Sequence, residues 1–452
     1  MPAAFRLLFT AFTLSLVSAS TAVTQPALPR YAFRPGQEIT YRTDWSTKYS
    51  QGDLTGQTDE AETMTVWVLH ANADGSFRLV VRARDVSTHT SGQKKQEPQV
   101  STMLLYTDIF PDGRQLPTHN ITDTVVASLL FPPLPKSDAE LVVGWDEWAQ
   151  DFRFECKPAR DAQNFAFDAS VISPFDKTLQ DSHTARYTFD LRRGLISRSE
   201  DLFRRDMKTR GVGSGTTELV SSGMMKPDAL KQMAHDADRY FIALDQYNAE
   251  MRGASQATPA EATRILSGAQ TQLKEFADTL VQPDLIEDMR ERLDDHGRRA
   301  ARQMDQAKQW SKLISKPAPD FTLADVEGKS VHSADLRGKV VVLDFGFRGC
   351  GPCVRSMPQM NKLAQDFANQ PVAIFNMSVD KDPADARFVA ERMKLNYPTL
   401  LATAVEDEFG VTACPTLFII DQEGITRHID DGYSPTLRQD VGKIVRNLLT
   451  TR

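Results

Sequence analysis

The chain is poor in cysteine, with only four among its 452 residues. Small exported proteins that depend on disulfides for stability are much richer in cysteine, so a disulfide framework does not hold this chain together. Two of the four, Cys350 and Cys353, form a Cys-Gly-Pro-Cys motif, whereas Cys156 and Cys414 stand alone. The scarcity of cysteine therefore directs attention to this one pair.

Basic clusters are also missing, and the net charge of -7 argues against a nucleic-acid partner. The first half of the chain contains no metal-ligand cluster, no Ser/His/Asp spacing and no phosphate-binding loop. Beyond the N-terminus, no apolar run is long enough to span a bilayer. With 41% hydrophobic and 25% charged residues, the composition is that of an ordinary protein long enough for two or three domains.

Residues 1–22 have the pattern of a signal peptide. Arg6 precedes an apolar run at 7–17, and small residues follow at 18–22. The run has the length of a signal-peptide core and is short for a membrane span. We therefore expect export to the periplasm or another extracytoplasmic compartment; if the segment is not cleaved, it would anchor the chain to the membrane.

Residues 31–222 predict a β-rich domain, because apolar residues alternate with polar ones along several runs. Residues 72–75 and 192–194 have turn composition. Cys156 alternates with two aromatic residues, which indicates a buried free thiol on an inward strand face. Further strands are predicted at 102–107, 151–157, 185–190 and 194–203.

Residues 226–312 change to a helical period and predict three amphipathic helices. The second opens with a capping box, in which Thr258 precedes Pro259 and Glu261, and the third opens at Pro283. Such helices would serve as an interaction or dimerisation arm, or as a spacer packed on its own domains. The periodicity favours the spacer.

Residues 339–354 predict an apolar strand, a tight loop and a helix that begins at the cysteine pair. The N-terminus of a helix stabilises a thiolate, which is the nucleophile in disulfide exchange. Cysteines three apart lie on nearly the same helix face, so Cys350 can attack a substrate and Cys353 can resolve the mixed disulfide. Gly351 permits the sharp turn, and Pro352 fits an early helical position.

From about residue 315 to the C-terminus, the sequence resembles the TlpA/ResA-like thioredoxin-fold oxidoreductases. The segments at 317–323, 336–343 and 414–421 occur with the cysteine pair in the order found in that family. The unit at 377–398 resembles the strand and helix that distinguish the family from plain thioredoxin. The resemblance implies an α/β thioredoxin-like fold and thiol–disulfide exchange, with Pro415 as a cis-proline packed against the disulfide.

The resemblance also suggests roles for residues near the motif. Asp344 occupies the position where thioredoxins carry a buried acid, and burial there would raise its pKa and let it exchange a proton with Cys353. Alternatively, Asp344 hydrogen-bonds loop N–H groups. Arg348 replaces the usual aromatic or small rim residue, and its charge would favour a thiolate. We expect Arg348, Gly351, Pro352 and Cys414 to contact the substrate.

Cys414 precedes the expected cis-proline and has three possible roles. The thiol can fill an apolar space, or complete a three-thiolate metal site with Cys350 and Cys353, or compete with Cys353 for a mixed disulfide on Cys350. No fourth ligand stands out nearby, so we expect no metal. We also expect no cofactor other than the redox-active Cys350–Cys353 disulfide.

Two other functions fit parts of the sequence. Peroxiredoxins share the thioredoxin fold, but where their nucleophilic motif needs Pro and Thr this chain has Leu343 and Phe347, so we reject a peroxidase. The second alternative is that this chain is an envelope protein that binds a ligand or partner. In that case the β-rich domain carries the main role, and the thioredoxin-like domain is accessory.

The favoured prediction is a multidomain exported thiol–disulfide oxidoreductase. It has a β-rich N-terminal domain at 31–222, an α-helical spacer at 226–312 and a C-terminal α/β thioredoxin-like domain at 315–452 that we expect to fold alone. Its partners are a protein thiol or disulfide substrate and a membrane-bound electron donor or acceptor.

Overall fold

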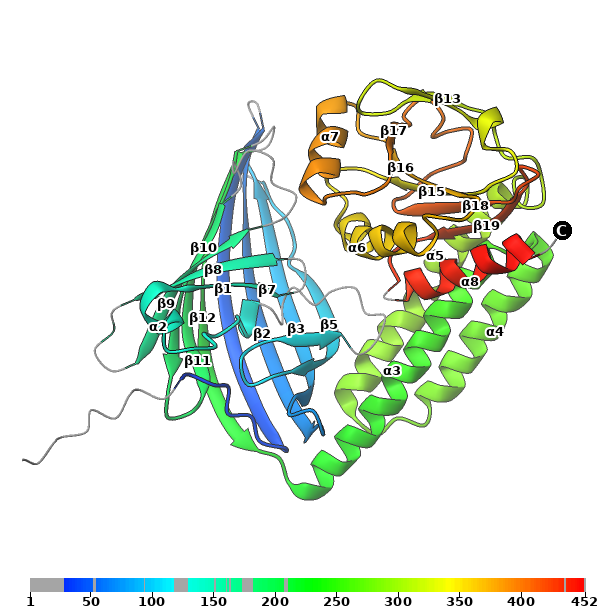
Figure 1. Cartoon of the computed structure of the whole chain (residues 1–452). Coiled ribbons are helices and arrows are strands. Elements are labelled where there is room, and N and C mark those ends of the chain that lie inside the picture. The colour runs from blue at the N-terminus through cyan, green and yellow to red at the C-terminus, as the bar shows by residue number, and fades with distance from the viewer. Residues whose placement is uncertain are drawn as a thin grey trace, which may run out of the picture.

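The computed structural model describes residues 28–51, 54–92, 94–117, 129–149, 152–159, 161, 164–172, 182–206, 210–434 and 436–450. The predicted signal segment, residues 1–22, lies outside these ranges. Within them, no helix is long and apolar enough to cross a membrane. Figure 1 shows a large β-sheet, long helices beside it, and a smaller α/β unit next to the helices.

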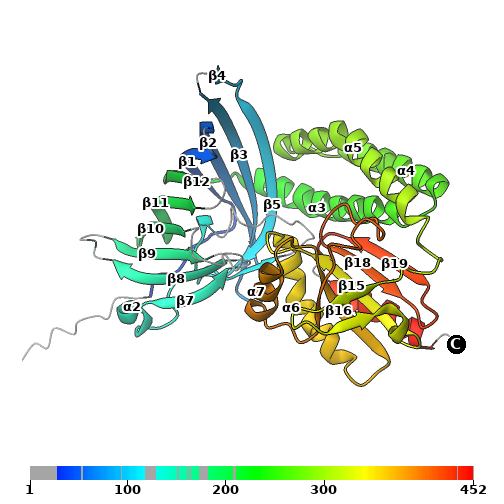
Figure 2. The same cartoon turned by 90° about the horizontal axis from the view of Figure 1, so that it is seen from above.

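The large sheet has twelve strands, and all of its pairings are antiparallel. Its order is β6-β5-β3-β2-β1-β12-β11-β10-β9-β8-β7, with β4 paired to β3, so the first and last long strands meet in the middle. Figure 2 shows that the sheet is strongly curved. The strands are β1 Gln37–Gln51, β2 Leu54–Ala71, β3 Phe77–Ser91, β4 Lys94–Lys95, β5 Gln99–Ile109, β6 Gln115–Pro117, β7 Trp145–Ala149, β8 Phe152–Ala159, β9 Phe165–Ile172, β10 Ser182–Asp190, β11 Leu195–Asp206 and β12 Arg210–Met224.

The four predicted strands at 102–107, 151–157, 185–190 and 194–203 correspond to β5, β8, β10 and β11, but the sequence pattern missed β12 and also β4, β6, β7 and β9. Glycine weakens a strand, and β12 contains Gly213 and Gly215 in its first half. Both glycines accommodate Trp45 of β1, since a Cβ atom at Gly215 would lie 2.1 Å from the Trp45 ring. The glycines therefore make room for an indole on the neighbouring strand.

One face of this sheet carries an aromatic core. Tyr31 and Phe33 precede β1 and pack on Phe131, with ring centroids 5.4 and 5.3 Å away. The short helix α2 (Glu140–Val143) leads into β7, whose Trp145 joins the same cluster. Cys156 of β8 is buried there as a free thiol, which confirms the prediction for this residue.

Three helices cover the opposite face of β2, β3 and β5: α3 Pro227–Ser255, α4 Pro259–Ala277 and α5 Pro283–Trp310. Each has a proline in its first turn, and the Thr258 hydroxyl accepts the N–H of Glu261 at the start of α4. Tyr106 of β5 stacks on Phe241 of α3 at 4.5 Å. The apolar stripes of the helices are thus packed within the chain.

The C-terminal unit has a five-stranded sheet in the order β17-β16-β15-β18-β19. Strand β15 is parallel to β16 and antiparallel to β18. Side chains on the two faces of the sheet form separate clusters, one of them with α6 and α8. The elements are β13 Thr322–Ala324, β14 Ser330–His332, the 3-10 helix Ser333–Leu336, β15 Val340–Gly346, α6 Gly351–Asp366, β16 Val372–Ser378, α7 Pro383–Arg392, β17 Thr399–Leu401, β18 Thr416–Ile420, β19 Thr426–Asp431 and α8 Leu437–Thr450.

The last turns of α5 join the C-terminal unit. Trp310 is 2% exposed and packs in the same cluster as Phe321 and Phe345. One turn earlier, the Gln306 Nε2 donates to Asp431 Oδ2 of β19 at 2.9 Å. The hydrophobic core of this unit therefore begins before residue 315, where the sequence predicts the domain boundary.

Candidate active site

The cysteine pair lies where β15 runs through a short loop into α6. Cys350 and Cys353 form a disulfide with an S–S distance of 1.96 Å and a Cα–Cα distance of 5.3 Å. Cys350 is the N-cap of α6, and its Sγ accepts the backbone N–H of Cys353 at 3.1 Å. An N–H group of the first helical turn thus points at the sulfur on which a thiolate would form, which favours the charged state.

The first turn of α6 presents little bulk. A Cβ atom added at Gly351 would meet nothing within 4 Å. Pro352 has no backbone N–H, and this costs no hydrogen bond because an N–H in the first turn has no acceptor inside the helix. Phe347, three residues before Cys350, is 41% exposed, so an aromatic side chain adjoins the motif. These residues leave room for a polypeptide next to the disulfide.

Gly346 brings the end of β15 close to the second cysteine. A Cβ atom at Gly346 would lie 3.2 Å from Cys353 Sγ, which is tighter than ordinary van der Waals contact. Residues alternate between faces along a strand, so Asp344 projects from β15 on the same face as Gly346. The register of β15 therefore places the Asp344 side chain on the side of the strand that Cys353 occupies.

Asp344 is buried, with 3% of its surface exposed. Burial raises the pKa of its carboxyl to about 7, because removal from water penalises the charged form. Among the residues that the structure describes, no backbone N–H donates to this carboxyl, so the loop-bonding alternative has no counterpart there. A carboxyl with this pKa can accept or donate a proton near neutral pH.

Tyr397 is a residue near Asp344 that the sequence analysis did not single out as a site. Its hydroxyl is buried without a hydrogen-bond partner among the described residues. Burial raises the Tyr397 pKa, and the Asp344 carboxylate raises it further. In the sequence, Tyr397 and Pro398 end the unit at 377–398 that distinguishes the family from thioredoxin. A single aromatic residue there does not indicate that it lies near Asp344.

The Cys414–Pro415 peptide bond is cis. Thr416 of β18 pairs with Phe345 of β15, so the antiparallel register places Pro415 beside Gly346 and the loop to the disulfide. The Pro415 carbonyl accepts the N–H of Gly432 at 2.9 Å. The expected cis-proline thus lies at the same edge of the sheet as the cysteine pair.

Cys414 is partly exposed and unbridged. Burial raises the pKa of its thiol to about 12, with smaller contributions from Glu406, Asp344 and Asp380. The protonated thiol is therefore the stable form near neutral pH, which lowers its reactivity as a nucleophile. Among the described residues, no group of His, Cys, Asp and Glu side chains has an arrangement that could hold a metal ion.

Arg348 is bound to α7 and the loop before it. Its backbone N–H donates to Asp380, and its guanidinium donates to Asp385 at 2.9 Å and lies 4.8 Å from the ring centre of Phe388. The Asp385 carboxylate neutralises part of the positive charge. The help that Arg348 gives to a Cys350 thiolate is therefore smaller than the isolated charge in the sequence suggests.

Comparisons with known proteins place similarity in the C-terminal part of the chain. The family model described as the AhpC/TSA family matches residues 314–429. The thiol-disulfide oxidoreductase ResA of Geobacillus thermodenitrificans is 36% identical over 121 residues, which are 26% of this chain and 70% of that protein. The thioredoxin-like protein YneN of Bacillus subtilis is 32% identical over 118 residues, covering 25% and 69%.

Solved structures give similar coverage. A putative thiol:disulfide interchange protein DsbE from Chlorobium tepidum is 26% identical, with a TM-score of 0.29, and the match covers 30% of this chain and 97% of that protein. A putative thioredoxin from Neisseria meningitidis is 32% identical, with a TM-score of 0.27, covering 29% of this chain and 92% of that one.

Proposed function

The chain belongs to the ResA-like family of thioredoxin-fold thiol-disulfide oxidoreductases, and we propose that Cys350 and Cys353 are the residues with which it exchanges disulfides with protein substrates. The observation that carries this proposal is the position of the disulfide, with Cys350 as the N-cap of α6 and its sulfur bonded to the N–H of Cys353. The names of the relatives favour this function over a binding protein in which the redox domain is accessory.

The reaction takes two steps. In the reducing direction, the Cys350 thiolate attacks one sulfur of a substrate disulfide, forming a mixed disulfide and displacing the other sulfur as a thiolate. The Cys353 thiolate then attacks Cys350 Sγ, which releases the second substrate sulfur and forms the Cys350–Cys353 disulfide. The substrate gains two electrons and the enzyme loses two, and the reverse sequence oxidises a substrate dithiol.

The surrounding residues have supporting roles in this proposal. Asp344 takes the proton of Cys353 before the second step, for which a pKa of about 7 is suited. Pro415, next to the loop, shapes the surface on which the substrate lies. Gly351, Pro352, Arg348 and Cys414 contact the substrate beside it. The reaction needs no cofactor beyond the redox-active disulfide.

The cellular setting is part of the proposal. The signal-like segment at 1–22 supports export to a compartment where the protein would meet substrates that form disulfides. An enzyme that reduces substrate disulfides there loses two electrons per cycle, so a membrane-bound donor must replace these electrons. An enzyme that oxidises substrate thiols needs a membrane-bound acceptor instead. The helices α3–α5 act as a spacer between the β-rich domain and the redox domain.

Substrate trapping tests the proposal. Cys353→Ser can form the mixed disulfide but cannot resolve it, so it should accumulate covalent adducts on non-reducing gels, and mass spectrometry should locate them on Cys350. Cys350→Ser is the matched control and should trap none. The full chain should also reduce a model protein disulfide, and both variants should be inactive. Wild-type activity in Cys350→Ser would overturn the assignment.

A further inference from the structure

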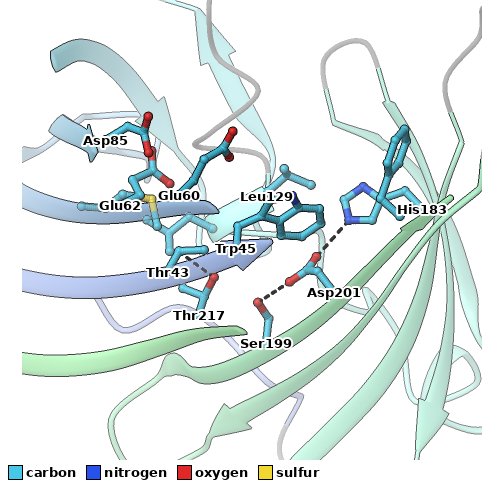
Figure 3. Close-up of a pocket in the computed structure, with 13 residues that line it drawn as sticks. Thr43, Trp45, Glu60, Glu62, Asp85, Leu129, His183, Ser199, Asp201 and Thr217 are labelled. Atoms are coloured by element: carbon cyan, nitrogen blue, oxygen red, sulfur yellow. Dashed lines mark hydrogen bonds and ion pairs between the residues drawn. The ribbon is translucent and has the colours of Figure 1, made fainter. Parts of the chain in front are cut away.

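A cavity of about 320 Å³ lies on the large sheet, away from the cysteine pair. It is lined by residues of β1, β2, β3, β10, β11 and β12 and by Leu129 and Leu130. Met64 and Leu130 also belong to the aromatic core, so the cavity opens on the face opposite to helices α3–α5. Figure 3 shows its polar groups gathered at two ends.

Three carboxylates occupy one end of the cavity. Glu62 of β2 pairs in register with Asp85 of β3, and Glu60, two residues before Glu62, lies on the same face of β2. Like charges directly opposite each other on neighbouring strands destabilise a sheet. None of the described residues that line the cavity is a lysine or arginine, and none of the three carboxylates forms an ion pair with a described residue.

The electrostatics of this end agree with a missing positive charge. The pKa of Glu62 is raised to about 7, mainly by burial and to a smaller extent by the neighbouring Asp85 and Glu60 carboxylates. The pKa values of Glu60 and Asp85 are also raised, again mainly by burial. One bound cation would stabilise the charged forms of all three carboxyl groups at once.

The wall between the two ends is apolar and fixed in place. The Trp45 Nε1 donates to Thr47 Oγ1 at 2.6 Å, and the indole lies against Gly213 and Gly215 of β12, where side chains would collide with it. Leu129 lies beside Trp45 in the cavity. An aromatic ring held in this way offers both an apolar surface and a face that attracts cations.

The polar groups at the other end are already paired. Asp201 bonds to the His183 Nε2 at 3.0 Å and accepts the Ser199 hydroxyl at 2.8 Å. This end therefore does not compete with the three carboxylates for a positive charge. The carboxylate end also does not form a group of described residues that could hold a metal ion, so its chemistry suits an organic cation better.

We propose that this cavity binds an organic cation that carries an apolar group. The charged head would lie against Glu60, Glu62 and Asp85, and the apolar part would lie along Trp45 and Leu129. Two sources share this chemistry: a free amphiphilic amine, and a lysine side chain of a bound polypeptide. The site is built on the β-rich region and needs neither Cys350 nor Cys353.

Calorimetric titration of the full chain tests this with octylammonium as the probe, and octanoate and octanol as probes of equal chain length. Octylammonium should bind with a Kd below about 1 mM, and both controls should bind at least about tenfold more weakly. The double variant Glu62→Gln, Asp85→Asn should weaken octylammonium binding by at least about tenfold. Glu97→Gln removes an exposed carboxylate that does not line the cavity and should leave binding unchanged.

Thermal unfolding separates loss of the site from loss of the fold. Removing mutually repelling charges should leave the double variant at least as stable as the wild type, and octylammonium should raise the Tm of the wild type alone. Equal binding of octylammonium and octanoate, or unchanged binding in the folded double variant, would overturn the proposal, and so would no binding to the wild type. Binding of a lysine-containing apolar peptide is then compared with binding of its norleucine analogue. Tighter binding of the lysine peptide would show that the site accepts a lysine side chain of a polypeptide as well as a free amine. Disulfide exchange is measured separately and does not depend on the result.

Discussion

The Sγ of Cys350 accepts the backbone N–H of Cys353 at 3.1 Å, so the first cysteine caps the helix that carries the second. After reduction, the same N–H group faces a sulfur that can become charged. The two cysteines are close in sequence but differ in position relative to the helix end. This asymmetry supports the proposal that Cys350 attacks the substrate and Cys353 resolves the mixed disulfide.

We expect the reduced enzyme to be alkylated faster at Cys350 than at Cys353 near neutral pH. The helix N-terminus should hold the Cys350 pKa well below that of a free cysteine, which is about 8.5. Iodoacetamide labelling at a series of pH values, read by mass spectrometry of the two single-cysteine variants, measures both pKa values. Equal rates, or faster labelling of Cys353, would reverse the assignment.

Replacing Asp344 with Asn should stabilise the protein more at pH 8 than at pH 5. The folded-state pKa of about 7 lies above the ordinary value of 3.8, so the folded state holds a proton that the unfolded state releases, and stability falls as pH rises between these values. About two pH units separate pH 5 from the folded-state pKa of about 7, so at about 1.4 kcal/mol per unit the expected difference is about 3 kcal/mol. Urea unfolding at both pH values measures it. Equal stabilisation at pH 5 and pH 8 would show that the Asp344 carboxyl does not titrate between these pH values.

The same Asp344→Asn variant should slow the resolving step, because Cys353 loses its proton acceptor. We expect a fall in exchange rate of about 10²-fold, the lower end for loss of a general base. Stopped-flow measurement of mixed-disulfide decay at several pH values separates this step from the first attack. Unchanged decay across the pH range would remove Asp344 from the mechanism.

Gly346→Ala should alter the disulfide, because the added methyl group would lie 3.2 Å from Cys353 Sγ. We expect a shift in reduction potential, measured by equilibration with glutathione, and a loss of stability of about 1 kcal/mol from the crowding. Gly297→Ala is the control, since a Cβ atom at this position of α5 meets nothing within 4 Å. If both variants keep the wild-type potential, the contact at Gly346 is without consequence.

The fragment 283–452 should be more stable than the fragment 315–452. The sequence predicts that the shorter one folds alone, but it lacks Trp310, which is buried in the core of the C-terminal unit. Loss of a buried large aromatic side chain costs about 3 kcal/mol or more. Urea unfolding of the two fragments compares them, and exchange assays show whether the shorter one remains active. Equal stability would place Trp310 outside the folding unit.

Cys414→Val keeps most of the volume of the side chain and removes its sulfur. We expect intact folding, with a shift in the reduction potential or in the exchange rate, because the pairing of β18 with β15 places this segment beside the loop to the disulfide. The raised pKa of the thiol favours a modest effect over loss of activity. If potential and rate both equal those of the wild type, Cys414 serves only in packing.

Much of the candidate site could be predicted because its signals are local. The apolar run that ends at Gly346 and the paired cysteines lie within a few residues of each other, and a helix begins there for reasons of capping and backbone geometry. In the same way, Thr258 and Pro259 predict where α4 begins, and the helix begins at Pro259. The burial of Cys156 followed from alternation along one strand.

Other features depend on contacts between distant segments. Strand β12 was missed because its glycines disfavour a strand until Trp45, more than 160 residues earlier, lies across them. The pattern of α5 shows an apolar stripe but not that its last turn packs in the next unit through Trp310. Tyr397 could not be linked to Asp344 from its position in the sequence.

The sequence by itself therefore determined the chemistry of this protein: a cysteine pair at a helix N-terminus, an acid at the end of a buried strand, and the succession of strand-rich, helical and α/β regions. Local periodicity, capping and residue type suffice for these. Only the tertiary structure decided which side chains meet. Strand register placed Glu62 opposite Asp85 and brought Trp45 over the glycines of β12, because pairing in a sheet joins residues that no local pattern connects.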